Sequence, residues 1–284
     1  MDNQNSDFEI ELGLLLEAIY LKYKYDFRDY SRASLKRRMS LALRELNCAT
    51  LSALQDKILH DPIIFSELLQ YLTIPVTEMF RDPSYFRAIR EKVIPVLKTY
   101  PSLKIWVAGC STGEEAYSYA ILLKEEGLLD RTIIYATDIN AKSLQKAQAG
   151  VFGLDDIQKF TKNYQRSGGK ATFSDYYTAN FDAAIFHKSL KSNITFTDHS
   201  LSTDSVFSET QFISCRNVLI YFDRKLQDRA LGLFYESLGR KGFLGLGPKE
   251  TIEFSKYAKA FDTIIEKERI YQKNENDPLQ EKKL

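Results

Sequence analysis

The stretch W-V-A-G-C-S-T-G-E-E-A-Y-S-Y-A, residues 106–120, decides the fold of the chain around it. An apolar run stops at Gly109, and after Gly113 a helical pattern opens with Glu114 and Glu115. A glycine-broken turn from strand to helix is typical of an open α/β sheet, in which ligands bind beyond the carboxyl ends of the strands. The sequence therefore predicts a ligand site at residues 109–113.

The spacing of the two glycines excludes two common classes of ligand site. The turn reads G-x-x-x-G, which is neither the G-x-G-x-x-G of dinucleotide sites nor the G-x-x-x-x-G-K-[ST] of phosphate loops. The carboxylates of Glu114 and Glu115 suit the positive end of a helix dipole but repel a phosphate. We therefore expect a ligand that is not anionic where it meets this turn.

A further carboxylate, Asp138, ends the next apolar run in Y-A-T-D-I-N. An acidic residue in this place accepts hydrogen bonds from a ribose diol in nucleotide-binding folds. S-adenosylmethionine fits both positions, because it combines an adenosine with a sulfonium and an α-ammonium group and carries no phosphate. The residues favour this cofactor, although glutamates that open a helix also occur as ordinary capping residues.

The chain from residue 103 onwards alternates between strand and helix patterns. Strands are predicted at 103–109, 132–138, 210–215 and 242–247, helices at 114–126, 141–149 and 223–238, and a hairpin at 261–273. The strands are continuously apolar, as expected when both faces of a parallel sheet are covered. This pattern predicts a doubly wound, Rossmann-like α/β domain. Residues 151–196 break the alternation and are interpreted as a small insert of short strands at the carboxyl edge of the sheet.

The first seventy residues read as a small all-helical bundle with one strongly basic helix. In that helix Leu35, Met39, Ala42, Leu43 and Leu46 share one apolar stripe at 100° per residue. Lys36, Arg37 and Arg44 lie on the opposite side, and residues 22–44 hold eight basic residues against two acidic ones. The basic face is either a solvated surface or a docking surface for an acidic partner.

The composition excludes several other functions. A formal net charge of +1 gives no overall bias towards nucleic acid or a membrane. No apolar run approaches the ~20 residues of a membrane span, and the first residues lack the pattern of a signal peptide, so a cytoplasmic location is expected. The three cysteines and three histidines show no ligand spacing, so we expect no metal. Nothing indicates oligomerisation, and a monomer is expected.

Four motifs together resemble the CheR-type chemotaxis receptor methyltransferases. They are, in chain order, L-T-I-P-V-T-E-M-F-R-D-P at 72–83, A-G-C-S-T-G-E-E-A-Y-S at 108–118, A-T-D-I-N at 136–140 and F-I-S-C-R-N-V-L-I-Y-F-D at 212–223. The resemblance covers nearly the whole chain. It implies a helical receptor-docking domain at 1–70, a linker motif and lead-in helix at 71–102, a methyltransferase domain at 103–275 containing the insert, and a frayed tail at 276–284.

The resemblance also implies an activity and a set of site residues. Such enzymes transfer the methyl group of S-adenosylmethionine to receptor glutamates, giving methyl esters and S-adenosylhomocysteine. Residues that match the family's catalytic positions are Arg81 and Tyr221. Residues that match cofactor positions are Pro75, Thr77, Arg81, Gly109, Glu115, Asp138, Ser200, Leu201, Asn217 and Val218. The implied partners are the cytoplasmic helices of methyl-accepting receptors, with Lys36, Arg37 and Arg44 as candidates for docking on them.

The sequence departs from the family pattern at two of these positions. Pro75 stands where an asparagine is usual and lacks both the amide side chain and a backbone donor. Ser200 stands before Leu201 where an asparagine is also common, and it keeps only one hydroxyl. These departures leave open a second interpretation, a non-catalytic module of the same fold that binds S-adenosylmethionine. The sequence does not identify the receptor, its methylated glutamates, the signalling pathway, or whether the insert tethers a receptor peptide.

Overall fold

A computed structural model describes residues 2–73 and 76–274 of the chain. Within these residues the chain divides into two compact units. The first unit holds the residues up to 73 together with 200–204 and 220–230, and the second holds 76–199, 205–219 and 231–274. Pro75 and the tail predicted at 276–284 lie outside the described residues. No helix among the described residues is long and apolar enough to cross a membrane.

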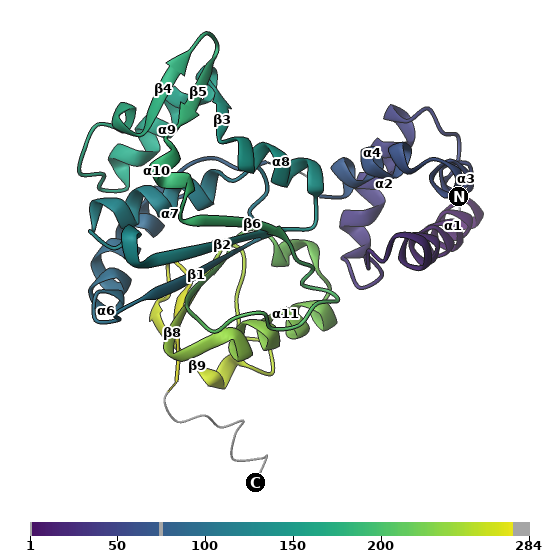
Figure 1. The fold of residues 1–284 in the computed structure, drawn as a ribbon. Coiled ribbons are helices and arrows are strands. Elements are labelled where there is room, and N and C mark those ends of the chain that lie inside the picture. The colour runs from purple at the N-terminus through teal and green to yellow at the C-terminus, as the bar shows by residue number, and fades with distance from the viewer. Residues whose placement is uncertain (1, 74–75, 275–284) are drawn as a thin grey trace. The chain divides into compact units, whose positions relative to one another are not determined.

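Helices of the N-terminal segment make up most of the first unit (Figure 1). They are α1 (Asp2–Tyr23), α2 (Arg32–Glu45), α3 (Leu51–His60) and α4 (Pro62–Leu72). Local capping sets two of the helix starts, because the side chains of Thr50 and Asp61 accept hydrogen bonds from the backbone amides of Ala53 and Ile63. The predicted helical bundle is confirmed.

The buried face of α2 differs in part from the predicted apolar stripe. Leu35, Met39 and Ala42 are buried as expected, but Leu43 and Leu46 are only half-buried. Arg38 is buried in their place, with 2% of its surface exposed. The prediction missed Arg38 because hydropathy alone assigns an arginine to the outer face.

A seven-stranded sheet forms the centre of the second unit, in the order β6-β2-β1-β7-β8-β10-β9. The strands are β1 (Leu103–Ala108), β2 (Thr132–Asp138), β6 (Ile194–Asp198), β7 (Thr210–Cys215), β8 (Leu238–Leu246), β9 (Phe261–Ile265) and β10 (Ile270–Lys273). The first five in this order run parallel, and β10 is antiparallel to both β8 and β9. This confirms the predicted Rossmann-like sheet and the predicted terminal hairpin.

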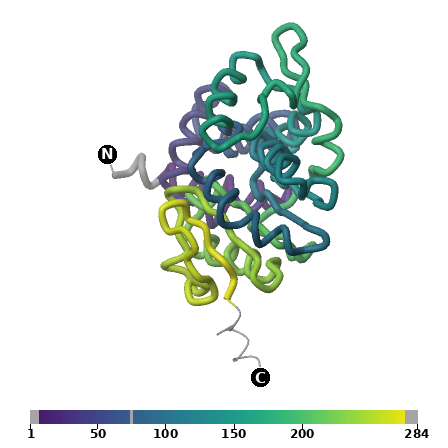
Figure 2. Tube along the Cα trace, turned by 90° about the vertical axis from the view of Figure 1, so that its left-hand side faces the viewer, coloured from purple at the N-terminus to yellow at the C-terminus, as the bar shows by residue number. Residues whose placement is uncertain are grey.

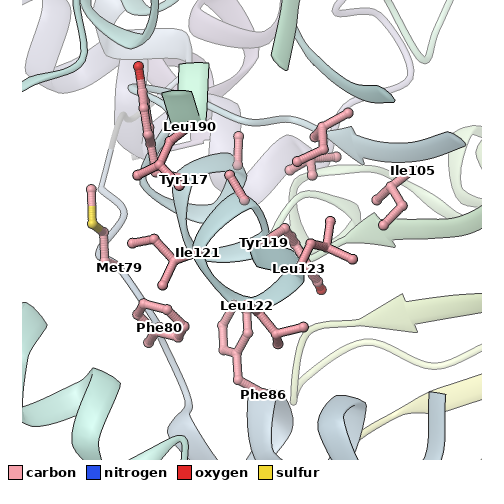
Figure 3. Close-up of a cluster of buried hydrophobic side chains, with 14 of the residues drawn as sticks. Met79, Phe80, Phe86, Ile105, Tyr117, Tyr119, Ile121, Leu122, Leu123 and Leu190 are labelled. Atoms are coloured by element: carbon pink, nitrogen blue, oxygen red, sulfur yellow. The ribbon is translucent and has the colours of Figure 1, made fainter. Parts of the chain in front are cut away.

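Both faces of this sheet are covered, as its apolar strands predict. The helical elements along the chain after the linker, outside the insert, are α5 (Pro83–Ala88), the π-helical segment η1 (Ile89–Val93), α6 (Ile94–Leu97), α7 (Glu114–Glu125), η2 (Leu129–Arg131), α8 (Ala141–Ala149), η4 (Leu219–Tyr221), α11 (Arg224–Ser237) and η5 (Ala258–Ala260). Residues 220–230, which include most of η4 and the first half of α11, belong to the first unit, and the other elements belong to the second. Ile105 faces the apolar side chains of α7 in a buried core (Figure 3). The next residue, Trp106, points to the other face and meets the ring of Phe234, with 5.4 Å between ring centroids.

The insert contains a second, three-stranded antiparallel sheet in the order β3-β5-β4. Its elements are β3 (Val151–Gly153), α9 (Leu154–Arg166), η3 (Phe173–Tyr176), β4 (Tyr177–Asn180), β5 (Ala183–Phe186) and α10 (Lys188–Lys191). The β4–β5 hairpin projects from the rest of the second unit (Figure 1, Figure 2). The predicted short strands are present, but the prediction missed α9, whose buried residues Ile157, Phe160 and Tyr164 follow helical spacing.

Candidate active site

The glycine turn lies between β1 and α7 and holds an unusual backbone conformation. Gly109 and Gly113 have φ values of +74° and +96°, which residues other than glycine rarely adopt. A Cβ atom on Gly109 would also lie 2.4 Å from Val218 Cγ2, and one on Gly113 would lie 2.8 Å from Ala147 Cβ. The two glycines therefore let the turn approach both the segment after β7 and helix α8.

Asp138, at the end of β2, lies against this turn. Its carboxylate accepts hydrogen bonds from the backbone amides of Ser111 at 2.8 Å and Asn140 at 2.9 Å. Burial raises the pKa of Asp138, while these two amides act in the opposite direction. Each carboxylate oxygen has a second lone pair, so the side chain can still accept a hydrogen bond from a ligand.

The two glutamates that open α7 have different surroundings. Glu114 is buried, and the hydroxyl of Thr112 donates to its carboxylate at 2.7 Å. Burial raises the pKa of Glu114 to about 7. Glu115 instead accepts hydrogen bonds from Ser214 Oγ at 2.7 Å and from Arg216 Nη1 at 3.2 Å. The prediction gave both glutamates the same role as negative charges at the start of the helix, and it did not identify Arg216 as the partner of Glu115.

Arg216 is a central residue of the site that the sequence reasoning missed. Only 1% of its side chain is exposed, and it forms ion pairs with Asp82 at 2.6 Å and Glu115 at 3.2 Å. Its guanidinium also lies 4.0 Å from the centre of the Tyr85 ring. Although burial acts against it, the carboxylates of Glu115 and Asp82 keep the pKa of Arg216 above its ordinary value. An arginine directly after the apolar strand F-I-S-C was the available signal, because a charge in that place needs partners.

The linker motif that precedes α5 is anchored to the same region. The backbone amide of Phe80 donates to Ser118 Oγ on α7 at 2.9 Å, and Phe80 itself is fully buried. Arg81 donates to the backbone oxygen of Val76 at 3.3 Å, and Thr77 is half-buried. The carboxylates next to Arg81 have other partners, since Asp82 pairs with Arg216 and Glu78 with Lys159.

Asn217 and Val218 follow Arg216 in a strained turn, with Asn217 at φ 62°. The carboxylate of Glu250 fixes this turn by accepting hydrogen bonds from the amides of Asn217 at 2.9 Å and Gly247 at 2.6 Å. The side-chain oxygen of Asn217 is buried and has no hydrogen-bond partner among the described residues. A buried acceptor without a partner normally indicates a ligand or a water. It suits the amino group of an adenine, so the residues present fit the expected cofactor.

The other predicted site residues belong to the first unit. The hydroxyl of Ser200 lies 2.8 Å from that of Ser202, and Leu201 is buried. Tyr221 lies in η4, with the guanidinium of Arg38 4.0 Å from its ring centre. Of the three docking candidates, Arg37 and Arg44 are exposed. The third, Lys36, is half-buried, with its ammonium 5.4 Å from the centre of the Phe8 ring.

The parallel sheet, the glycine turn and the acidic residue at the end of β2 define the class of an S-adenosylmethionine-dependent methyltransferase. Family comparison agrees. The model described as "CheR methyltransferase, SAM binding domain" matches residues 75–269, and "CheR methyltransferase, all-alpha domain" matches residues 10–73. The chain belongs to the CheR methyltransferase family, which confirms the resemblance inferred from the motifs and the predicted cofactor.

Two relatives illustrate the range of similarity within the family. The chain is 60% identical to "Putative methyltransferase Cher3" of Pseudomonas putida, over 94% of this chain and 97% of that protein. It is 30% identical to "Chemotaxis protein methyltransferase" of Listeria monocytogenes, over 80% of this chain and 84% of that protein. The name of the first relative states no substrate, whereas the name of the second refers to chemotaxis.

Proposed function

We propose that this methyltransferase acts on glutamate side chains of chemoreceptors and produces glutamate methyl esters and S-adenosylhomocysteine. One observation carries the proposal: the protein already provides a partner for every carboxylate around the glycine turn. Glu114 is bonded by Thr112, Glu115 by Arg216, and Asp138 by backbone amides. Because these partners already engage the three carboxylates, we assign none of them the role of a general base. A glutamate substrate needs no base, because its side chain is ionised at neutral pH.

The residues of the second unit have proposed roles in holding the cofactor. Asp138 accepts from the ribose, and Asn217 with Val218 receives the adenine side of the nucleoside. The rest of the cofactor is proposed to lie against Gly109, Glu115 and Thr77. When bound, S-adenosylmethionine supplies a sulfonium methyl group, which passes to the substrate carboxylate oxygen while the carbon–sulfur electron pair stays on sulfur. Arg81 holds a carboxylate, either that of the substrate or that of the methionine moiety.

The remaining work of such an enzyme is positioning, since both reacting groups are charged and lose their charge in the transfer. We assign Tyr221 to the neighbourhood of the transferred methyl group, where an aromatic ring favours a sulfonium. Lys36, Arg37 and Arg44 are assigned to docking on an acidic receptor helix. The support for these roles is the family's motif pattern, together with the exposure of Arg37 and Arg44 on α2.

The experiment that tests the proposal combines binding with the chemistry of the product. Calorimetric titration with S-adenosylmethionine and S-adenosylhomocysteine is expected to show binding that Asp138→Ala weakens by roughly 10- to 100-fold, the usual effect of losing a hydrogen bond to a charged group. Asp130→Ala, at an exposed position before β2, serves as the matched control.

The product is tested by incubating the protein with methyl-tritiated cofactor and cytoplasmic fragments of chemoreceptors from the same genome. Label that alkali releases as methanol identifies carboxyl methyl esters, and alkali-stable label would contradict the proposal.

A specific observation favours a second candidate, a non-catalytic module that binds S-adenosylmethionine. The hydroxyl of Ser200 is already engaged, since it contacts Ser202 Oγ and accepts from the Ser202 amide at 3.3 Å. A serine engaged in this way offers a ligand less than the asparagine common in the family. Binding of the cofactor without labelling of any receptor fragment would favour this candidate.

A further inference from the structure

Arg38 is the one arginine of α2 whose side chain lies inside the first unit, in the stretch of helix that also carries the basic outer face. Its Nη1 donates to the backbone oxygen of Leu72 at the end of α4. Its Nε and Nη2 are buried and have no hydrogen-bond partner among the described residues. Burial lowers the pKa of Arg38 from its ordinary value. A buried guanidinium without a carboxylate partner destabilises a protein, so its place calls for an explanation.

The aromatic ring of Tyr221 is the principal neighbour of this guanidinium. The distance between the guanidinium carbon and the ring centre is 4.0 Å, which is well within the range of a cation–π contact. A planar guanidinium that stacks on a ring while donating to a carbonyl is held at two points. Arg38 therefore restricts both the position of the Tyr221 ring and the direction that it faces.

The backbone around Tyr221 is fixed to the same unit by its neighbours. The amide of Ser31 donates to the oxygen of Tyr221 at 2.8 Å, and the amide of Asp223 donates to the oxygen of Asp29 at 2.9 Å. Between them, Tyr30 and Phe222 form an isolated antiparallel bridge, with their rings 4.9 Å apart. Phe222 is buried, whereas Tyr221 is half-buried. The segment 29–31, directly before α2, thus sets the backbone of Tyr221, and Arg38 sets its ring.

We infer that Arg38 is a positioning residue for methyl transfer, and that the helical unit holds the ring of Tyr221 through it. This inference rests on the role of Tyr221 in the proposed function. It gives the helical unit a part in the chemical step besides docking. A misplaced ring impairs the geometry of transfer more than the binding of either substrate, so the effect belongs in kcat.

The test uses four variants of the full chain, each with one substitution. Arg38→Met removes the charge at similar length, and Arg38→Lys keeps the charge but loses the planar group. Arg32→Met is the matched control, because Arg32 is an exposed arginine at the start of the same helix. Two measurements are made. The alkali-labile methyl assay gives kcat and KM for S-adenosylmethionine, and NMR follows the signals of ring-labelled tyrosine. With 17 tyrosines in the chain, Tyr221→Phe identifies the signal of Tyr221 by its loss.

The expected result is a split between the kinetic constants. Arg38→Met should lower kcat roughly 10- to 100-fold while KM for the cofactor stays within about threefold, and the Tyr221 signal should shift. Arg38→Lys should lower kcat by less, and Arg32→Met should match the unmodified protein. An unchanged Tyr221 signal in Arg38→Met would overturn the inference, whatever happens to the rates.

The two measurements separate this inference from the proposed function. If the unmodified protein methylates no receptor fragment, the proposed function fails, and the Tyr221 signal alone decides whether Arg38 holds the ring. If Arg38→Met does not fold, Arg38→Lys is judged by the same signal and the same kinetic split. A parallel loss of cofactor affinity and kcat in Arg38→Lys would also overturn the inference, since it would place the effect in binding.

Discussion

Glu114 and Glu115 are adjacent in the sequence, but the protein gives their carboxylates different states. Glu115 faces Ser214 and Arg216 and is held as the charged partner of an ion pair. Glu114 is buried and is bonded by the hydroxyl of Thr112. A single position along the helix therefore separates a carboxylate that pairs with an arginine from one that is buried and bonded to a hydroxyl.

The raised pKa of Glu114 makes the stability of the protein depend on pH. Because its pKa is about 7 in the folded protein and 4.5 ordinarily, the folded state binds more protons than the unfolded state between these values. The free energy of unfolding therefore falls as pH rises through this window, by about 3 kcal/mol at most. Glu114→Gln, which cannot ionise, should lose this decline. Urea unfolding of both proteins between pH 4.5 and 8 measures the difference.

An exposed glutamate provides the control for this prediction. Glu91→Gln, at an exposed position in η1, should leave the pH dependence as it is in the unmodified protein. Parallel stability curves for Glu114→Gln and the unmodified protein would show that Glu114 does not titrate in this range.

At the scale of elements, α7 connects two different parts of the second unit. Its N-terminus carries the acidic residues of the glycine turn, and its C-terminus carries Glu125, whose side chain is 3% exposed. Glu125 accepts hydrogen bonds from the hydroxyl of Tyr164 and from the hydroxyl of Tyr176, and it pairs with Arg90. Helix α9 and η3 of the insert are thereby attached to the same helix that opens at the turn.

This attachment predicts a large effect of a small change. Glu125→Gln keeps the shape of the side chain but leaves Arg90 with less negative charge in a buried place, because Arg90 is itself only 7% exposed. Arg90 keeps Glu126 as a second partner at 3.1 Å, so the expected loss is that of one charged hydrogen bond, and the free energy of unfolding should fall by about 1.5–3 kcal/mol. Urea unfolding gives the total, and hydrogen exchange over residues 154–176 should show faster exchange in the insert.

A peripheral partner of the same cluster serves for comparison. Lys98 is 48% exposed and pairs with Glu126 at 3.1 Å, so Lys98→Met should lower the free energy of unfolding by less than about 1 kcal/mol. Equal losses in Glu125→Gln and Lys98→Met would mean that the cluster is a surface network rather than a buried clamp.

For the molecule as a whole, the sequence was sufficient for features that depend on local pattern. Apolar periodicity predicted the sheet and the helical bundle, and the glycine spacing placed the turn. It was not sufficient where a polar side chain is buried by partners distant in the chain. Arg216 and Arg38 have this property, since Asp82 and Leu72 lie far from them in sequence. Helix α9 was missed for another reason, because its aromatic and polar composition resembles that of short strands.

The basic face of α2 remains a prediction about the whole molecule and its partner. Arg37 and Arg44 are exposed. Among the described residues Arg44 forms an ion pair with the adjacent Glu45, and its side chain is 73% exposed. Reversing both charges (Arg37→Glu with Arg44→Glu) should raise KM for receptor fragments roughly tenfold or more at low salt. The effect should shrink above ~0.5 M salt, since screening shortens the reach of exposed charges. Cofactor affinity and kcat should stay unchanged, because these side chains point to solvent.

The control is Lys259→Glu with Lys267→Glu, an equal charge reversal at exposed positions of the second unit. Unchanged receptor methylation by the α2 variant at low salt would show that the basic face is only a solvated surface.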